Sequence, residues 1–417
     1  MKGFTLLSAV ALATMALTSA AFAQKAVSAP TLTEEGVRTV TFTGRPTVHR
    51  IDLRGDFQPA GSTPDPYVYL QTMFSRWNDA GVSGLSFFSF TGGRTLGDDV
   101  VLLGGAPDPG QFGYSTTTPV ACISEITFAL FSVDPTGGNL ELRLDIHPWN
   151  GLFTSAAGAS IAGGTLTLTI PPVSNPPGFA IFLITVPVSP SLPVPKAFWV
   201  AATPNTLNST INLNNIGLLV ANSTPGNVSM LPGRGYFRAA TPPTAFTAVT
   251  GGSVFTGVPQ GSFYLAIRGT HNFAGTVDMS ALNDRAKPSD PLAFEFDDDP
   301  TGDPDEGIEE ALRRNIVDVE VVNDSDPQNP FTSRFTTYLD ENGRFTLPVS
   351  AEIASITVRR WDNGLKVTFN RPADGWRTDP CSPTVASQTM TFGDVNGDGI
   401  IDDADLLTVL FGFGSSE

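Results

Sequence analysis

The chain has 417 residues and a formal net charge of −17 at pH 7. A negative charge of this size disfavours binding to nucleic acid, whose phosphates it would repel, and to an anionic membrane surface. Hydrophobic residues make up 41% of the chain and charged residues 16%, with 41 Gly and 34 Pro, which is typical of a protein built from strands and loops rather than helices.

The N-terminus, MKGFTLLSAVALATMALTSAAFAQ, has the three parts of a secretory signal peptide. Lys2 supplies the positive charge, residues 4–17 form an uncharged apolar run, and residues 21–23 (AFA) form a cleavage site. We therefore expect residues 1–23 to be removed after Ala23, and the mature protein to be secreted or held at the cell surface. The alternative is an uncleaved N-terminal anchor. No later stretch is long and apolar enough to predict a transmembrane helix, so no membrane span is expected.

Residues 24–290 contain many short strand-like segments separated by Gly and Pro turns, which predicts one large β-sandwich of jelly-roll type. In LELRLDI (140–146) apolar and polar residues alternate, as in a strand with one buried face. The segment AIFLITV (180–186) is apolar almost throughout, as in a strand at the centre of a core. Two smaller sandwiches are the alternative. Only residues 66–81 are expected to be helical.

Residues 291–312 are expected to form an acidic linker, because FEFDDDPTGDPDEGIEE (294–310) holds nine acidic residues and no basic one. The alternative is a calcium site within this linker. Its ligands would be five crowded aspartates: Asp297, Asp298, Asp299, Asp303 and Asp305.

Residues 313–371 are expected to form a small β-sandwich. Hairpin turns are predicted at the Asn-Gly pairs 342–343 and 363–364, because both residues tolerate the positive φ that such turns need. The strand order of 315–370, with its segment LDENGRFTLPV, resembles the carboxypeptidase-regulatory-like and prealbumin-like β-sandwiches of secreted proteins. Residues 372–392 are expected to form a second linker.

The last segment, residues 393–417, reads GDVNGDGIIDDADLLTVLFGFGSSE and has the spacing of a calcium-binding loop. Ca²⁺ takes six to eight oxygen ligands, and an EF-hand loop supplies them from positions 1, 3, 5, 7, 9 and 12, with a Gly at position 6 for the sharp turn. Counted from Asp394, Gly399 takes position 6 and Asp405 takes position 12, where an EF-hand has Glu. A flexible acidic tail is the alternative.

The segment GDVNGDGIIDDADLLTVLFGFG resembles a type I dockerin repeat, in which an Asp at position 12 and a Leu-rich helix follow the loop. A dockerin carries two such repeats, whereas this chain carries one. The resemblance implies a bound Ca²⁺ and a cohesin-like or cell-surface docking partner. It also implies a set of calcium ligands, with Ile400 giving its backbone carbonyl: Asp394, Asn396, Asp398, Ile400, Asp402 and Asp405.

The two cysteines, Cys122 and Cys381, lie in what we expect to be different parts of the fold. Export permits a disulfide, which would pin the C-terminal region onto the large sandwich. Two separate thiols are the alternative.

Dockerin-bearing chains are often polysaccharide-degrading enzymes, so the resemblance raises the question of a catalytic site in the large sandwich. A glycosidase needs a pair of carboxylates, but Glu125 and Glu141 are the only glutamates between residues 39 and 267, and both are expected to face solvent. We therefore predict no catalytic residue and no cofactor site beyond calcium. The segment DIHPWNG (145–151) either lines a sugar site with its Trp or forms a structural corner.

These patterns together predict a secreted or cell-surface, multidomain all-β protein that a calcium-binding tail docks or retains, and that binds carbohydrate or extracellular matrix. The alternatives are a component of extracellular polysaccharide breakdown with glycoside hydrolase activity, and a structural envelope protein.

Overall fold

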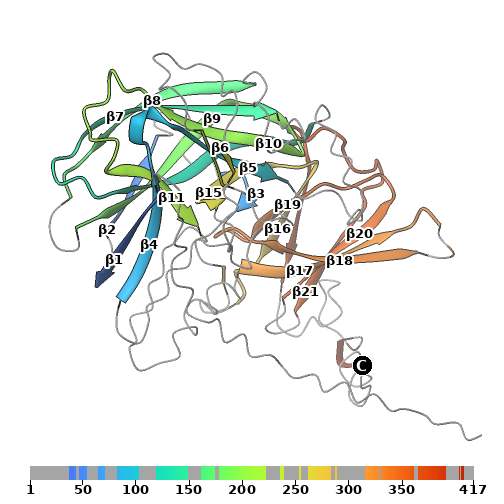
Figure 1. Cartoon of the computed structure of the whole chain (residues 1–417). Helices are drawn as coiled ribbons and strands as arrows, with labels where there is room; N and C mark the ends of the chain where they lie inside the picture. The colour runs from blue at the N-terminus through green and yellow to red at the C-terminus, as the bar shows by residue number, and fades with distance from the viewer. Residues whose placement is uncertain are drawn as a thin grey trace, which may run out of the picture.

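The structure is a computed structural model in which regular structure is almost entirely β-strand, so the all-β prediction is confirmed. The residues that it describes are 37–43, 47–53, 64–70, 82–102, 119–148, 161–173, 178–221, 235–238, 253–254, 262–282, 287–288, 315–326, 328, 330–360, 365–390, 403 and 405–407. Figure 1 shows a larger group of strands, coloured blue to yellow, beside a smaller group coloured mainly orange and red.

The larger group contains a nine-stranded sheet built around the long strand β6 (Pro119–Ser132). β6 pairs with β9 along one edge, and with β15 and then β11 along the other. The sheet contains eight strands besides β6, including the three just named. Their bounds are β1 (Val37–Thr43), β2 (Thr47–Asp52), β3 (Tyr67–Leu70), β4 (Val82–Ser89), β9 (Ala180–Pro195), β11 (Ile216–Ala221), β14 (Ser262–Phe263) and β15 (Leu265–Thr270).

A six-stranded sheet packs against one face of the nine-stranded sheet. The short 3-10 helix η2 (Thr91–Gly93) follows β4 in the chain and precedes β5, the first strand of this second sheet. The strand order in this second sheet is β13-β12-β5-β10-β7-β8. Their bounds are β5 (Thr95–Val101), β7 (Gly138–Pro148), β8 (Ala162–Ile170), β10 (Ala197–Pro204), β12 (Gly235–Arg238) and β13 (Ser253–Val254).

The burial pattern of β7 and β9 follows the two patterns seen in the sequence. On β7 the alternating apolar residues of 140–146 enter the core between the two sheets, while Glu141 and Arg143 stay outside it. On β9, Phe182 and Ile184 enter that same core, whereas Ile181 and Leu183 enter a second cluster on the opposite face of the nine-stranded sheet. β9 is apolar almost throughout because both faces of its sheet are covered.

The smaller group is a second sandwich of a three-stranded and a four-stranded sheet. The orders are β19-β16-β22 and β18-β17-β20-β21. Phe273 on β16 lies at the centre of the core, with ring centroids 5.6 Å from Phe369 and 5.2 Å from Trp376. The strand bounds are β16 (Phe273–Asp278), β17 (Ile316–Asn323), β18 (Phe331–Tyr338), β19 (Arg344–Leu347), β20 (Ile353–Arg359), β21 (Lys366–Asn370) and β22 (Thr384–Thr389).

Two segments of the small sandwich lie in ranges for which we expected other roles. β16 falls in the range 24–290 of the large sandwich, and β22 falls in the second linker, 372–392. In the structure β16 pairs antiparallel with β19 and parallel with β22. The pairing therefore places both strands in the small sandwich, which is closed by segments from before and after the acidic stretch.

The hairpin expected at Asn342-Gly343 does not form, because the chain changes sheets there. β18 before the turn pairs with β17, whereas β19 after it pairs with β16. Gly343 has φ +72°, but no residue other than Gly has a positive φ among those described, so the turn is not the expected type. Asp340 builds it instead, since its Oδ1 accepts hydrogen bonds from the backbone N–H groups of Asn342 and Arg344, both at 2.9 Å.

The helix expected at residues 66–81 is wrong for its first part, because Tyr67–Leu70 form the buried strand β3, paired with β15. The residues that follow lie outside the described part of the chain. The second Asn-Gly pair also lies outside it, although the flanking strands β20 and β21 pair antiparallel.

Candidate functional site

Of the six predicted calcium ligands, the structure describes only Asp405, at loop position 12. Asp394, Asn396, Asp398, Ile400 and Asp402 lie outside the described residues, as does the alternative cluster in the acidic linker. Asp405 lies in a helical turn and is only 4% exposed, whereas Leu406 and Leu407 are 58% and 47% exposed. An acid turned inward beside two leucines turned outward reverses the ordinary preference of these residues. The structure therefore buries the carboxylate of Asp405 and exposes the two leucines that follow it.

Asp145 and His147 belong to β7 and lie on the face of the strand opposite to Ile146, which enters the core between the two sheets. The carboxylate of Asp145 pairs with Nε of Arg143, at 3.0 Å to Oδ1 and 2.9 Å to Oδ2. His147 lies beside Trp199 of β10 in the strand register, and these two residues are 2% and 6% exposed. A sugar ring needs an open aromatic face, and Trp199 does not offer one. Trp149 lies outside the described residues.

The two glutamates considered as a catalytic pair have separate partners. Glu141 accepts hydrogen bonds from the side-chain amides of Asn205, at 2.6 Å, and Asn208, at 3.0 and 3.1 Å. Glu125 was expected to face solvent, but it is 4% exposed, and its Oε1 lies 3.5 Å from Nε of Arg268. The burial is tolerated because the guanidinium compensates the carboxylate charge.

Arg268 is the centre of a buried charged cluster where the two sandwiches meet. Its Nη1 lies 3.3 Å from Oδ2 of Asp340, and its Nη2 donates to Oε1 of Glu341 at 2.8 Å. Nη2 also donates to the hydroxyl of Tyr67, whose ring centroid lies 4.0 Å from the guanidinium carbon. Burial alone lowers the pKa of Arg268, but Tyr67, Glu341 and Asp340 outweigh it and raise the pKa above its ordinary value. The cluster therefore joins β15 of the large sandwich to the turn before β19.

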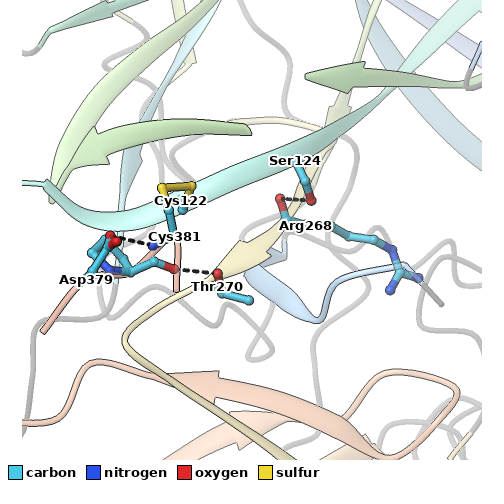
Figure 2. Close-up of a disulfide and its surroundings, with 7 residues drawn as sticks. Cys122, Ser124, Arg268, Thr270, Asp379 and Cys381 are labelled. Carbon is cyan, nitrogen blue, oxygen red and sulfur yellow. Dashed lines mark hydrogen bonds between the residues drawn. A yellow bond between two sulfur atoms is a disulfide. The ribbon is translucent and has the colours of Figure 1, made fainter. Parts of the chain in front are cut away.

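A disulfide between Cys122 and Cys381 ties the same junction covalently. Figure 2 shows Cys122 on β6 and Cys381 in the C-terminal segment, with the side chain of Arg268 pointing away from the bridge. Next to the bridge, the hydroxyl of Thr270 donates to the carbonyl of Pro380 at 2.6 Å. Of the two alternatives left open by the sequence, the structure has the bonded one, and it pins the C-terminal region onto the large sandwich.

His271, between β15 and β16, makes the third connection between the two sandwiches, after the Arg268 cluster and the disulfide. Its Nδ1 lies 2.8 Å from the carbonyl of Val120, and its backbone N–H donates to Oγ1 of Thr346 at 2.7 Å. Because a carbonyl only accepts, Nδ1 carries the proton, and Nε2 is buried without a hydrogen-bond partner among the described residues. Burial lowers the pKa of His271 to about 4, although the bond to Val120 acts in the opposite direction.

The sequence contained no signal for this junction beyond the two cysteines. Arg268 and Asp340 lie 72 positions apart, and only the packing of the two sandwiches brings them together.

Comparisons with protein-family models, with curated proteins and with solved structures found no match to this chain. Within the described part of the chain, no helix is long and apolar enough to cross a membrane. In the same part, no three side chains of the His, Cys, Asp and Glu types are grouped so that they could hold a metal ion.

Proposed function

We propose that this protein is an exported binding protein, that its C-terminal loop is ordered by Ca²⁺, and that the ordered tail attaches it to a cohesin-like or cell-surface partner. The ligand that we propose for the β-sandwiches is polysaccharide, because the tail resembles a module common in polysaccharide-acting proteins. The ligands for Ca²⁺ would be the oxygens of Asp394, Asn396, Asp398, Asp402 and Asp405, with the carbonyl of Ile400.

The observation that carries the proposal is the orientation of the turn at residues 405–407. The carboxylate at loop position 12 is buried, as a side chain that closes a calcium shell must be. Leu406 and Leu407, on the same turn, are exposed and form an apolar surface suited to a docking partner. A helix of the expected extent, about residues 403–411, would not be stable alone, so Ca²⁺ on one side and a partner on the other would both stabilise it.

The bridge between Cys122 and Cys381 supports the export part of the proposal. Disulfides form and persist in oxidising compartments and are rare in a reducing cytosol. The signal-peptide pattern in residues 1–23 independently favours the same route.

Calcium titration by calorimetry tests the proposal on the purified mature protein. We expect one Ca²⁺ to bind to the unaltered protein and none to the double variant Asp394→Ala, Asp398→Ala. The matched control is Asp403→Ala, because Asp403 is exposed, lies beside the same turn and is not among the predicted ligands. Absence of binding to the unaltered protein at millimolar Ca²⁺ would reject the proposal, and so would equal loss of binding in the Asp403 variant.

A further inference from the structure

A cavity of about 250 Å³ lies beside the disulfide, with walls from both sandwiches. Asp65, Ser191 and Cys122 belong to the large sandwich, and Thr276, Arg344 and Cys381 to the small one. The disulfide therefore forms part of the wall. Ligand sites are common at such boundaries between two packed units.

The floor of the cavity is kept open by small residues on β16. Ala274 and Thr276 point away from the core of the small sandwich, and Gly275 lies between them. A volume of about 250 Å³ is below the range of roughly 300–1,000 Å³ typical of sites for drug-sized ligands. The cavity therefore suits a smaller molecule, of the size of a single sugar ring.

Several polar groups in the wall have no partner within the described part of the protein. The carboxylate of Asp65 and the hydroxyls of Ser191 and Thr276 make no hydrogen bond or ion pair there. Arg344 uses Nε and Nη2 on Oδ2 of Asp340, at 3.1 and 2.7 Å, which leaves its Nη1 hydrogens available. Ser191 is exposed, and Asp65, Thr276 and Arg344 are half-buried, so water can bond to these groups in the free protein. A ligand that supplies hydrogen bonds replaces those made by water, whereas an apolar occupant would remove them without replacement and is disfavoured.

The charged side chains in the wall of the cavity further limit which class of ligand it can bind. The lining holds one carboxylate, from Asp65, and one guanidinium, from Arg344, whose charge Asp340 already compensates. This disfavours an anion as the ligand. Sugar hydroxyls both donate and accept, and so they can pair with the carboxylate, the guanidinium and the two wall hydroxyls.

We propose that this junction cavity binds a single neutral sugar residue, either a monosaccharide or the end of a polysaccharide chain. The inference rests on the proposed function in one respect, the choice of polysaccharide as ligand. The disulfide and the Arg268 cluster hold the two walls together before any ligand arrives. Binding therefore avoids part of the cost of ordering the site.

Saturation-transfer NMR on the oxidised mature protein tests the proposal, with glucose, galactose, mannose, xylose and N-acetylglucosamine as separate probes. We expect transfer to at least one of them, and a loss of affinity of about tenfold or more in Asp65→Ala and in Thr276→Val. The Thr276 variant keeps the side-chain shape and removes only the hydroxyl. Its matched control is Thr165→Val on the exposed strand β8, which should bind like the unaltered protein.

Transfer to none of the five sugars would overturn the proposal, as would transfer to the zwitterion glycine alone. Transfer that is equal in the Thr276 and Thr165 variants would place the sugar elsewhere and overturn the cavity assignment. That last result would leave the proposed polysaccharide ligand and the calcium-dependent tail standing. Failure of the calcium titration would reject the proposed attachment without affecting the NMR result.

Discussion

Arg268 shows how one side chain can connect two sandwiches. Its guanidinium is surrounded by Glu125, Asp340 and Glu341, and the first two of these are almost fully buried. Removing one member of a buried charged cluster leaves the others uncompensated, which costs about 3–5 kcal/mol. We therefore expect Arg268→Ala to lower the free energy of unfolding by that amount, measured by urea denaturation.

The control for this prediction is Arg334→Ala. Arg334 pairs with Glu320 at 2.7 Å, but its side chain is 76% exposed. Exposed ion pairs contribute at most about 1 kcal/mol, so this variant should unfold close to the unaltered protein. Similar losses in the two variants would contradict the role assigned to burial.

His271 makes the stability of the fold depend on pH. Its pKa is about 4 in the folded protein and 6.5 when unperturbed, so the unfolded chain binds more protons between these values. Stability from this residue is therefore complete above pH 6.5, falls as the pH drops, and is lost below about pH 4, a total of roughly 3 kcal/mol. Denaturation at a series of pH values should show a slope between pH 6.5 and 4 that is shallower in His271→Phe. An unchanged slope would contradict the prediction.

At the scale of the elements, β16 depends on one glycine. A Cβ on Gly275 would clash with Cε1 of Phe345, whose ring packs in the core of the small sandwich. Overpacking of this kind costs about 1–3 kcal/mol, so we expect Gly275→Ala to lower the urea midpoint. Gly164→Ala on β8 is the comparison, because a Cβ there meets nothing within 4 Å. Equal stability of the two variants would show that the Phe345 ring moves freely aside.

The individual strands were easier to predict than their partners. The alternation in 140–146 and the apolar run in 180–186 follow from burial on one or both faces, which any sheet imposes locally. The turn at 342–343 was predicted as a hairpin because Asn-Gly specifies a bend, but a bend does not specify which strand the chain pairs with next. Asp340 decides the turn geometry here, and its buried role depends on partners far away in sequence.

The candidate sites also differ in how far the sequence alone could predict them. The calcium loop stays a prediction; the sequence supports it because the proposed ligands are neighbours along the chain, and Asp405 is the one of these ligands that the structure describes. The junction could not be predicted, because Asp65, Thr276 and Arg344 meet only after both sandwiches have folded. Glu125 was misjudged for the same reason, since its compensating charge comes from Arg268 on another strand.

For the molecule as a whole, the disulfide closes a very long covalent loop. Cys122 and Cys381 are separated by 259 positions, and such a cross-link restricts the unfolded chain strongly. We expect the double variant Cys122→Ala, Cys381→Ser to lose about 2–5 kcal/mol of unfolding free energy in urea. The unaltered protein should show a similar loss in reductant, and the variant should show none. Insensitivity of the unaltered protein to reductant would contradict the prediction.

The position of the bridge also determines how the protein would carry mechanical load. Cys381 lies just before β22, the last strand among the described residues, and Cys122 lies in the central strand β6. Tension between β1 and a tethered tail would pass through β22 and across the two sulfur atoms into β6. The strands from β7 to β21 lie inside the covalent loop and would not be pulled apart while the bridge is intact. A protein held by its tail in flowing liquid would thus keep most of its folded strands out of the line of force.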